Sequence, residues 1–417
     1  MRRKWAATVI VLLAAAPAAR AGANRPYVVL GPSDGMALDQ PRVTIEVYDP
    51  GPPVQSFGPA THDYFLLDTG ASGIVAVSGL LGPGAAEELL AAGYQVEGTY
   101  IEQGVAGTEE FNVSAPYSVD FTGTDGLDHT ITGVRMLSST NIDFAGFDGL
   151  IGMPAMVDRI VTLDCTAFPV DWALGVDFPS SLPAGAGHRY SVPLELVEFP
   201  ASGAVEGSPI PTFAPLPFVQ AEARHGAGAA AAPFLIDTGA QMSILSETVA
   251  FGAGLDEDGS GSFNEEAIDF IAIGGVGGTV MAPVLIVDKL AIETESGVDL
   301  VWTDVRAAVL DIDESIPGVI GAELFTSGWM DSLFGGDDGF IEKIHFDFRE
   351  AGDLVGTMYL DINGDLDDVH PRAGDADGDG DVDLDDLFTV RNNFNLPGGW
   401  SDGDFDADGM VDLDDLF

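Results

Sequence analysis

The sequence predicts a mainly β protein built from two similar halves, each of which carries an aspartate from the end of a strand into a tight turn. Residues 65–70 read Phe-Leu-Leu-Asp-Thr-Gly, and residues 234–239, which begin 169 positions later, read Phe-Leu-Ile-Asp-Thr-Gly. Each aspartate is followed 82 residues later by an apolar-apolar-Gly triplet, at 150–152 and at 319–321. Landmarks repeated in the same order indicate a duplicated unit. The 53 Gly and 25 Pro suit a turn-rich β fold.

The first 23 residues have the features of an export signal. Three basic residues at 2–4 precede an apolar stretch at 5–16, and small residues at 19–23 offer a cleavage site. No later stretch is apolar for long enough to span a membrane as a helix. We therefore expect an extracellular or cell-surface protein without a membrane span after signal cleavage.

The expected mature chain is strongly acidic. The signal contains four of the 16 basic residues and none of the 67 acidic ones, so 12 basic residues remain and the net charge is 12 − 67 = −55. Such a surface repels nucleic acid and anionic membranes, and neither is expected as a partner. Cys165 is the single cysteine, so we expect a buried thiol and no intrachain disulfide.

Residues 24–176 are expected to form the first lobe. Short apolar runs at 27–30 and 43–47 indicate opening strands, and Asp68 ends the next strand. Residues 85–92 have helical character. A long hairpin is expected over 94–120, and a strand at 159–164 closes the lobe.

The second half repeats this plan. A Pro/Gly/Ser-rich stretch at 177–189 is expected to link the lobes. The second lobe, 190–363, has strands running through Asp237, a hairpin around 275–278 and a closing strand at 341–348. A linker at 364–373 then leads to a module of different composition, 374–417.

The repeated aspartates, Asp68 and Asp237, are candidates for a catalytic pair. If the halves pack about a local two-fold axis, the two carboxylates lie side by side, and they share one proton because like charges that close cannot both ionise. One can then act as general base on water while the other, protonated, polarises a carbonyl. This arrangement predicts peptide hydrolysis without a covalent intermediate. The alternative is a duplicated β scaffold in which both aspartates are structural turn residues.

The residues beside each aspartate suit this chemistry. The glycines let the backbone turn tightly and approach the reacting atoms. The threonines can hydrogen-bond across the axis, and the serine four positions after Asp68 can hydrogen-bond that aspartate, whereas its counterpart in the second half is Gln241. The supporting residues predicted in this way are Thr69, Gly70, Ser72, Thr238 and Gly239.

With these motifs the chain resembles the pepsin-like and retropepsin-like aspartic peptidases over residues 27–350. The resemblance implies a bilobal β fold with an interlobe cleft, a catalytic dyad of Asp68 and Asp237, a polypeptide substrate and a monomeric peptidase unit. Two glycine-rich hairpin tips are similar to the two flaps of retropepsins, whereas pepsins close one. The disulfides common in the secreted eukaryotic branch are missing here, and Tyr100 lies at a spacing that differs from the usual pepsin flap. The flap candidates are Tyr100, Gly104, Gly107, Gly275, Gly277 and Gly278.

Other catalytic schemes fit poorly. The sequence contains no Gly-x-Ser-x-Gly elbow, no His-Glu-x-x-His helix and no Gly-x-x-x-x-Gly-Lys loop. Six scattered histidines read as ordinary surface or core residues, and a single cysteine excludes a multi-thiolate zinc site within one chain. No cofactor is expected for catalysis.

The module at 374–417 contains two acidic runs with the register of calcium loops. Such loops place oxygen ligands at positions 1, 3, 5, 7 and 12, and Gly at position 6. The two copies start 29 residues apart, and a solvated acidic tail does not explain their identical register. The predicted Ca²⁺ ligands, with the residues at position 7 acting through their carbonyls, are Asp375, Asp377, Asp379, Asp381, Asp386, Asp404, Asp406, Asp408, Met410 and Asp415.

This paired repeat, with Asp at position 12, resembles a type I dockerin. That family binds cohesin modules and thereby docks enzymes onto a scaffold or cell surface, so the resemblance implies a cohesin or cell-surface partner. Two features depart from the family pattern. Positions 10 and 11 read Leu-Asp where Ser-Thr is frequent, and the second copy stops at Phe417, so we expect a truncated second half-module.

Together these features predict an exported aspartic endopeptidase carrying a calcium-binding docking module. Two alternatives remain open: a non-catalytic extracellular binding or scaffold protein, and an accessory component of a dockerin–cohesin polysaccharide-degrading assembly. The lobes show nothing specific to carbohydrate. Pepstatin binding, or cleavage of denatured protein at acidic pH, distinguishes the peptidase from a binding module.

Overall fold

A computed structural model of the chain describes residues 25–104, 107–142, 144, 146–185, 188–334 and 339–364, together with 376, 384–397, 403 and 410–411. Residues 26–370 belong to one compact unit and residues 371–416 to another. Within the described ranges, every helix is too short or too polar to cross a membrane.

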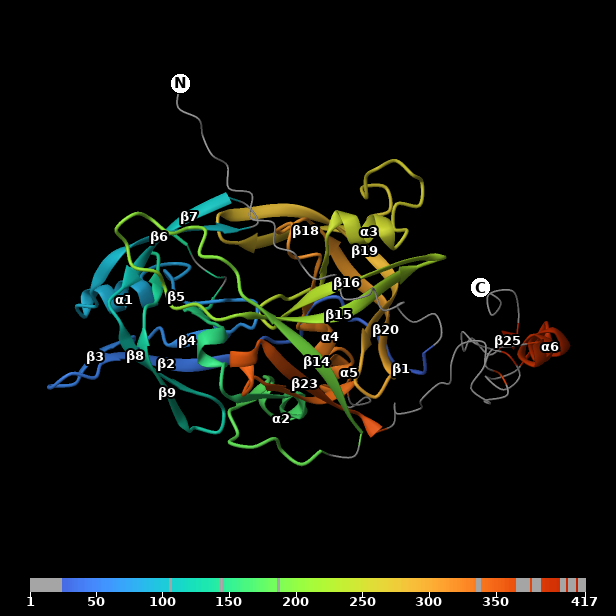
Figure 1. Ribbon diagram of the computed structural model, residues 1–417, viewed down its shortest axis with the longest axis horizontal. Coiled ribbons are helices and arrows are strands. Elements are labelled where there is room, and N and C mark those ends of the chain that lie inside the picture. The colour runs from blue at the N-terminus through green and yellow to red at the C-terminus, as the bar shows by residue number, and fades with distance from the viewer. Residues whose placement is uncertain are drawn as a thin grey trace, which may run out of the picture. The chain divides into compact units, whose positions relative to one another are not determined.

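The unit 26–370 is mainly β, as the sequence predicts (Figure 1). Many of its strands form where apolar and polar residues alternate, because successive side chains of a strand point to opposite faces of the sheet. In β2, for example, Val43, Ile45 and Val47 are buried and their neighbours are more exposed. The first sheet contains ten strands from the first half: β2 (Arg42–Asp49), β3 (Gln55–Gly58), β4 (Tyr64–Leu67), β5 (Ile74–Ala76), β6 (Val96–Gly104), β7 (Gly107–Ser114), β8 (Tyr117–Thr122), β9 (Asp128–Val134), β10 (Leu137–Ser138) and β11 (Gly149–Ile151).

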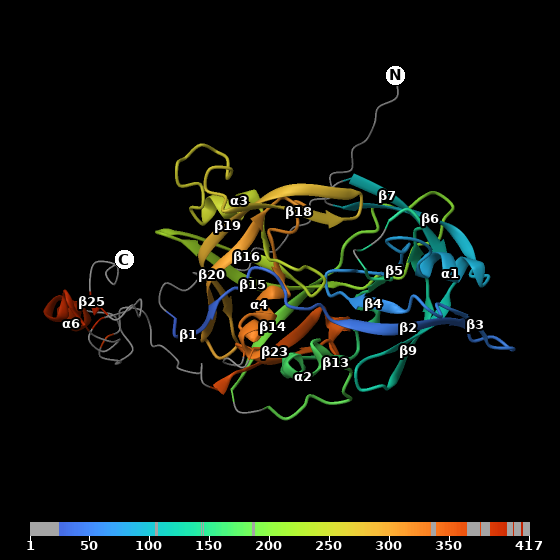
Figure 2. The same ribbon diagram turned by 180° about the vertical axis from the view of Figure 1, so that it is seen from behind.

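The second sheet contains thirteen strands and draws on both halves of the chain. In both views the strands of the first sheet, blue to green, lie on one side, and β15 to β20, yellow-green to orange, lie on the other (Figures 1 and 2). The thirteen strands are β1 (Tyr27–Pro32), β12 (Ile160–Asp164), β13 (Gly175–Asp177), β14 (Arg189–Val197), β15 (Leu216–His225), β16 (Gly228–Asp237), β17 (Ile244–Leu245), β18 (Asp269–Gly275), β19 (Gly278–Glu293), β20 (Asp299–Val309), β21 (Gly318–Gly321), β22 (Ile341–Asp347) and β23 (Val355–Ile362).

The repeat in the sequence is also a repeat in strand order. Six neighbouring strands of the first sheet follow the order β6-β7-β10-β5-β11-β4, and six of the second follow β18-β19-β20-β17-β21-β16. Every neighbouring pair has the same direction in both sets: β4 and β11 are parallel, as are β16 and β21, and both hairpins are antiparallel. The duplication therefore extends to the topology of the fold.

The two halves share a sheet and a hydrophobic core. Strand β12 of the first half pairs antiparallel with β22 of the second, and β1 pairs in parallel with β20. The expected interlobe linker, 177–189, joins β13 to β14 within this shared sheet. One cluster of buried side chains includes Leu67 and Ile151 from the first half with Ile236 and Ile320 from the second.

Helical segments are short and lie mostly at strand ends. The predicted helix at 85–92 is confirmed as α1, and α3 occupies the matching place in the second half. The thiol of Cys165 is free and buried, as expected. The helices of this unit are α1 (Ala85–Ala91), α2 (Phe168–Asp171), α3 (Glu247–Gly252), α4 (Glu323–Thr326) and α5 (Trp329–Ser332), with 3-10 turns at Met153–Ala155, Cys165–Ala167 and Ala351–Asp353.

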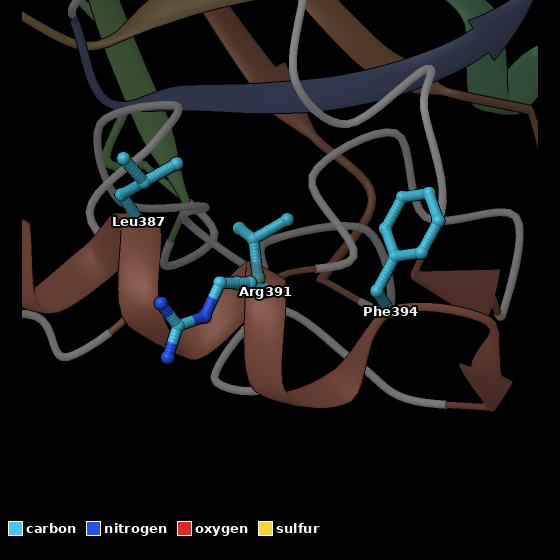
Figure 3. A pocket seen from close by; sticks show the side chains of 4 residues that line it. Leu387, Arg391 and Phe394 are labelled. Atoms are coloured by element: carbon cyan, nitrogen blue, oxygen red, sulfur yellow. The ribbon is translucent and has the colours of Figure 1, made fainter.

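In the C-terminal unit the structure describes one helix and a two-stranded sheet. Helix α6 spans Leu384–Asn393, and β24 (Leu396–Pro397) pairs antiparallel with β25 (Met410–Val411). Leu387, Val390, Arg391 and Phe394 line a small, largely apolar pocket at this helix (Figure 3).

Candidate active site

Both Asp-Thr-Gly turns are held by the same local arrangement. Asp68 follows β4 and Asp237 ends β16, and the apolar-Gly triplets form β11 and β21, which pair in parallel with those strands. The Asp68 amide donates to the Ile151 carbonyl at 3.1 Å. The triplets thus lie directly beside the Asp turns and support them from corresponding positions.

Two buried threonines connect the turns across the interface between the halves. Thr69 Oγ1 donates to the Ile236 carbonyl at 2.7 Å, and Thr238 Oγ1 donates to the Leu67 carbonyl at 2.6 Å. Each hydroxyl also accepts from the other threonine's amide, at 3.1 Å for Thr69 N and 3.0 Å for Thr238 N. Both threonines are only 1% exposed, and these four reciprocal hydrogen bonds fix one turn against the other.

The same interface places the carboxyl groups of Asp68 and Asp237 together. A Cβ on Gly70 would lie 2.4 Å from the Asp237 carboxyl carbon, and one on Gly239 would lie 2.6 Å from that of Asp68. Each carboxyl group therefore occupies the space that a side chain on the opposite glycine would fill. Glycine at both positions is what lets the two carboxyl groups approach.

Backbone amides orient the two carboxyl groups. Asp68 Oδ1 accepts from Gly70 N at 2.7 Å. Asp237 Oδ1 accepts from Gly239 N at 2.8 Å and from Ala240 N at 3.0 Å. Hydrogen bonds from N–H groups favour the ionised form of a carboxyl group, so they allow a negative charge to persist in this buried pair.

Burial and mutual repulsion make this pair hold a proton. Burial raises the pKa of Asp68 well above its usual value, and the charge of Asp237 and the hydrogen bond between the two side chains raise it further. Burial also raises the pKa of Asp237, while the hydrogen bond with Asp68 and the Gly239 and Ala240 amides act in the opposite direction. The two carboxyl groups therefore share a proton and titrate as one unit.

The position after each turn differs between the halves. The Ser72 carbonyl accepts from Ala214 N at 2.8 Å, and the structure records no hydrogen bond from its hydroxyl to Asp68, unlike the bond considered from the sequence. In the second half Gln241 Nε2 donates to Gln40 Oε1 at 3.0 Å, and Gln40 Nε2 donates to the Gly239 carbonyl. Gln40 supports the second turn, and no motif in the sequence marks it.

A second residue missed from the sequence, Glu323, lies next to the second turn. Its side chain is fully buried, its Oε1 accepts from Ser243 N at 2.8 Å, and its Oε2 has no hydrogen-bond partner among the described residues. Burial raises its pKa to about 7, the Ser243 hydrogen bonds act against this shift, and the charge of Asp237 adds to it. The available signal was an acidic residue two positions after Gly321, inside an apolar run.

The two glycine-rich hairpins meet at their tips. Gly104 pairs with Gly107 at the end of β6–β7, and Gly275 pairs with Gly278 at the end of β18–β19, as predicted. A Cβ on Gly104 would lie 2.5 Å from the Val276 carbonyl oxygen. Similarly, a Cβ on Gly277 would lie 2.4 Å from the Gly107 carbonyl carbon. Both views show β7 and β18 adjacent (Figures 1 and 2).

The first hairpin is held by residues 198–215, a connection between β14 and β15 that we call the strap. The Ile101 amide donates to the Gly203 carbonyl at 3.0 Å, and the Thr99 amide donates to Ser208 Oγ at 3.0 Å. The flap candidate Tyr100 is 4% exposed, and its hydroxyl oxygen accepts from Gly203 N at 3.3 Å. Strand β18 is the corresponding edge strand of the second hairpin, and within the described chain its only sheet neighbour is β19.

Most of the predicted calcium ligands lie outside the described residues. The described ones are Asp386, at the start of α6, and Met410, in β25. Asp386 is 3% exposed, and its Oδ1 accepts from Ala376 N at 2.7 Å. The side chain at predicted position 12 therefore turns back to the beginning of its loop.

Comparison with known proteins adds one finding. A model of the family described as aspartyl protease matches residues 221–324. The matched stretch runs from β15 to α4 and includes the second Asp-Thr-Gly turn, the second hairpin and the second apolar-Gly triplet. This match supports assignment to an aspartyl protease family. A search of curated proteins returned no match.

Proposed function

We propose that this protein is an aspartic endopeptidase with the bilobal fold of the pepsin-like and retropepsin-like enzymes, acting through Asp68 and Asp237. The observation that carries the proposal is the meeting of these two carboxyl groups, each seated against the opposite glycine and joined by a hydrogen bond. Two structural turn residues would not need to share buried space. The match of residues 221–324 to the aspartyl protease family points the same way.

The chemistry follows from the shared proton. Asp237, as carboxylate, takes a proton from a water molecule whose oxygen attacks the carbonyl carbon of the scissile bond, while Asp68 gives its proton to the carbonyl oxygen. The resulting diol collapses as the C–N bond breaks. The amine nitrogen takes the proton held by Asp237, and a diol hydroxyl returns a proton to Asp68, so the pair is regenerated.

The hairpins then act as flaps over an extended polypeptide. In the described conformation their tips touch at Gly104, Gly107, Val276 and Gly277, so substrate entry requires them to separate. The strap is bonded to β6, whereas β18 has no sheet neighbour other than β19 among the described residues. We therefore assign the larger movement to the second hairpin.

We further propose export by the segment 1–23 and calcium binding by the module 374–417. The inward turn of Asp386 toward Ala376 N fits a residue that closes a calcium loop, where Ca²⁺ would supply folding energy to the module. A cohesin-like or cell-surface partner for this module rests on the dockerin-like repeat in the sequence. Calcium takes no part in the proposed reaction.

The decisive experiment is digestion of an unfolded protein between pH 3 and 7 by the wild type, Asp68→Asn and Asp237→Asn, at saturating calcium. Cleavage by the wild type alone, inhibited by pepstatin, supports the dyad. Glu195→Gln, at an exposed position of β14, controls for the loss of a carboxylate and is expected to cleave normally. An inert but folded wild type across this pH range would leave the non-catalytic binding protein as the better description.

A further inference from the structure

The second turn contains an acidic residue that the mechanism above does not use. Glu323 begins α4, two residues after the apolar-Gly triplet, and it is 0% exposed. Its position in the first half, 169 residues earlier, is taken by Pro154 in a 3-10 turn. At this pair of equivalent positions, therefore, only the second half carries a carboxyl group.

Glu323 connects the segment that leaves the Asp237 turn with the triplet that supports it. Its Oε1 accepts from Ser243 N at 2.8 Å, and Ser243 Oγ in turn accepts from Gly321 N at 3.1 Å. Gly321 is the register partner of Asp237 between β21 and β16. The chain of contacts thus runs from Glu323 through Ser243 and Gly321 to the catalytic residue.

The surroundings of the other carboxyl oxygen indicate whether Glu323 is protonated or ionised. Glu323 Oε2 lies 2.3 Å from where a Cβ on Gly321 would be and has no hydrogen-bond partner among the described residues. A buried, unpaired charged oxygen is far more costly than a buried hydroxyl. The groups that act on the Glu323 carboxyl group are the like charge of Asp237, on β16, and the uncharged groups of Ser243, before β17.

We propose that Glu323 is a positioning residue of the peptidase site, which holds the Asp237 turn only while its own carboxyl group is protonated. It accepts the Ser243 amide in the neutral state and adds no charge behind Asp237. When it ionises, repulsion and desolvation displace the segment 240–243 and the turn with it. Loss of its proton therefore contributes to the alkaline limit of activity. This inference rests on the proposed function.

The test compares Glu323→Gln with the wild type over pH 4 to 9. The glutamine keeps an oxygen acceptor for Ser243 N and cannot ionise. We expect kcat/KM of this variant at pH 4–5 to stay within about threefold of the wild-type value. The fall of kcat/KM on the alkaline side of the pH profile, its alkaline limb, should move to higher pH. Glu323→Ala, which leaves the Ser243 amide without its acceptor, is expected to lower kcat/KM at least tenfold at every pH.

The matched control is Glu222→Gln, because Glu222 is a 7% exposed carboxyl group on β15 that is bonded to Arg224 and lies outside the dyad. Its alkaline limb should match that of the wild type. Two results would overturn the inference: an inactive but folded Glu323→Gln enzyme, or a pH profile superimposed on that of the wild type.

A second readout does not need activity. Urea midpoints of wild type and Glu323→Gln, measured between pH 5 and 8, should diverge, with the wild type losing stability relative to the variant as pH rises. Identical trends would refute the neutral state. If this divergence appears while the wild type cleaves nothing at any pH, the proposed peptidase activity fails and the neutral Glu323 stands.

Discussion

The reciprocal threonine bonds allow a quantitative test of how the halves are held together. Thr238→Val keeps the volume of the side chain but removes the hydroxyl that donates to the Leu67 carbonyl and accepts from the Thr69 amide. Both backbone groups are then left without a partner in a site that water does not reach. Each such group costs about 1–3 kcal/mol, so we expect a loss of about 2–6 kcal/mol in the free energy of unfolding.

The assay is urea unfolding followed by tryptophan fluorescence at saturating calcium, with the urea dependence of the free energy compared between proteins. Thr132→Val, at an exposed position of β9, is the matched control and should change stability by less than about 0.5 kcal/mol. The double change Thr69→Val with Thr238→Val tests coupling, since both hydroxyls belong to one network. We expect the double variant to lose at least about 1 kcal/mol less than the sum of the single losses.

Two outcomes would contradict this reasoning. A loss below about 1 kcal/mol in Thr238→Val would mean that the carbonyl and amide find other partners. Strict additivity of the two changes would mean that the four bonds do not act together, and that the turns are held by the surrounding strands instead.

Three further predictions follow from the same contacts. Gly239→Ala should reduce kcat/KM at least about 100-fold, because its Cβ would collide with the Asp68 carboxyl group. The control Gly352→Ala, with open space around its Cβ, should leave kcat/KM unchanged, and a fully active Gly239→Ala enzyme would contradict the close approach of the two carboxyl groups. Burial works against ionisation of Asp361, but hydrogen bonds from Arg189 and His345 lower its pKa to about 2. Its ionised form therefore stabilises the fold above about pH 4, and this contribution of about 1–2 kcal/mol is lost as the pH falls toward 2. Asp361→Asn should make the free energy of unfolding less dependent on pH in this range, and an unchanged pH dependence would refute the assignment. Ser208→Ala removes the acceptor of the Thr99 amide, so amide hydrogen exchange along β6 should become about fivefold faster while exchange along β18 is unaffected. An equal acceleration in both strands would argue against the strap as the anchor of the first hairpin.

The parts of the fold that the sequence predicted are those in which local patterns suffice. Alternating residues mark the strands, glycine pairs mark the hairpin tips, and the repeat identifies Asp68 and Asp237 as equivalent positions. The meeting of these two residues follows from symmetry and needs no detailed knowledge of the packing. The Ca²⁺ ligands remain a prediction, because the structure describes only Asp386 and Met410 among them.

The parts that were missed depend on contacts between residues far apart in the chain. Gln40 reaches the Gly239 carbonyl across 199 positions, and Ser208 reaches the Thr99 amide across 109. No local pattern distinguishes these polar side chains from solvent-exposed ones. Glu323 is the exception, because an acidic residue in an apolar run already implies burial with a raised pKa or a partner.

The exchange of hydrogen bonds between the turns means that neither half can complete the site alone. Because both halves belong to one polypeptide, their encounter is intramolecular, and dilution does not take the site apart as it would for separate subunits. In a dimer of identical chains every substitution appears on both sides of the axis. Here each copy is free to change alone, as Ser72 against Gln241 and Pro154 against Glu323 show. Fusion of the halves thus allows one aspartate to acquire an environment that its twin does not have.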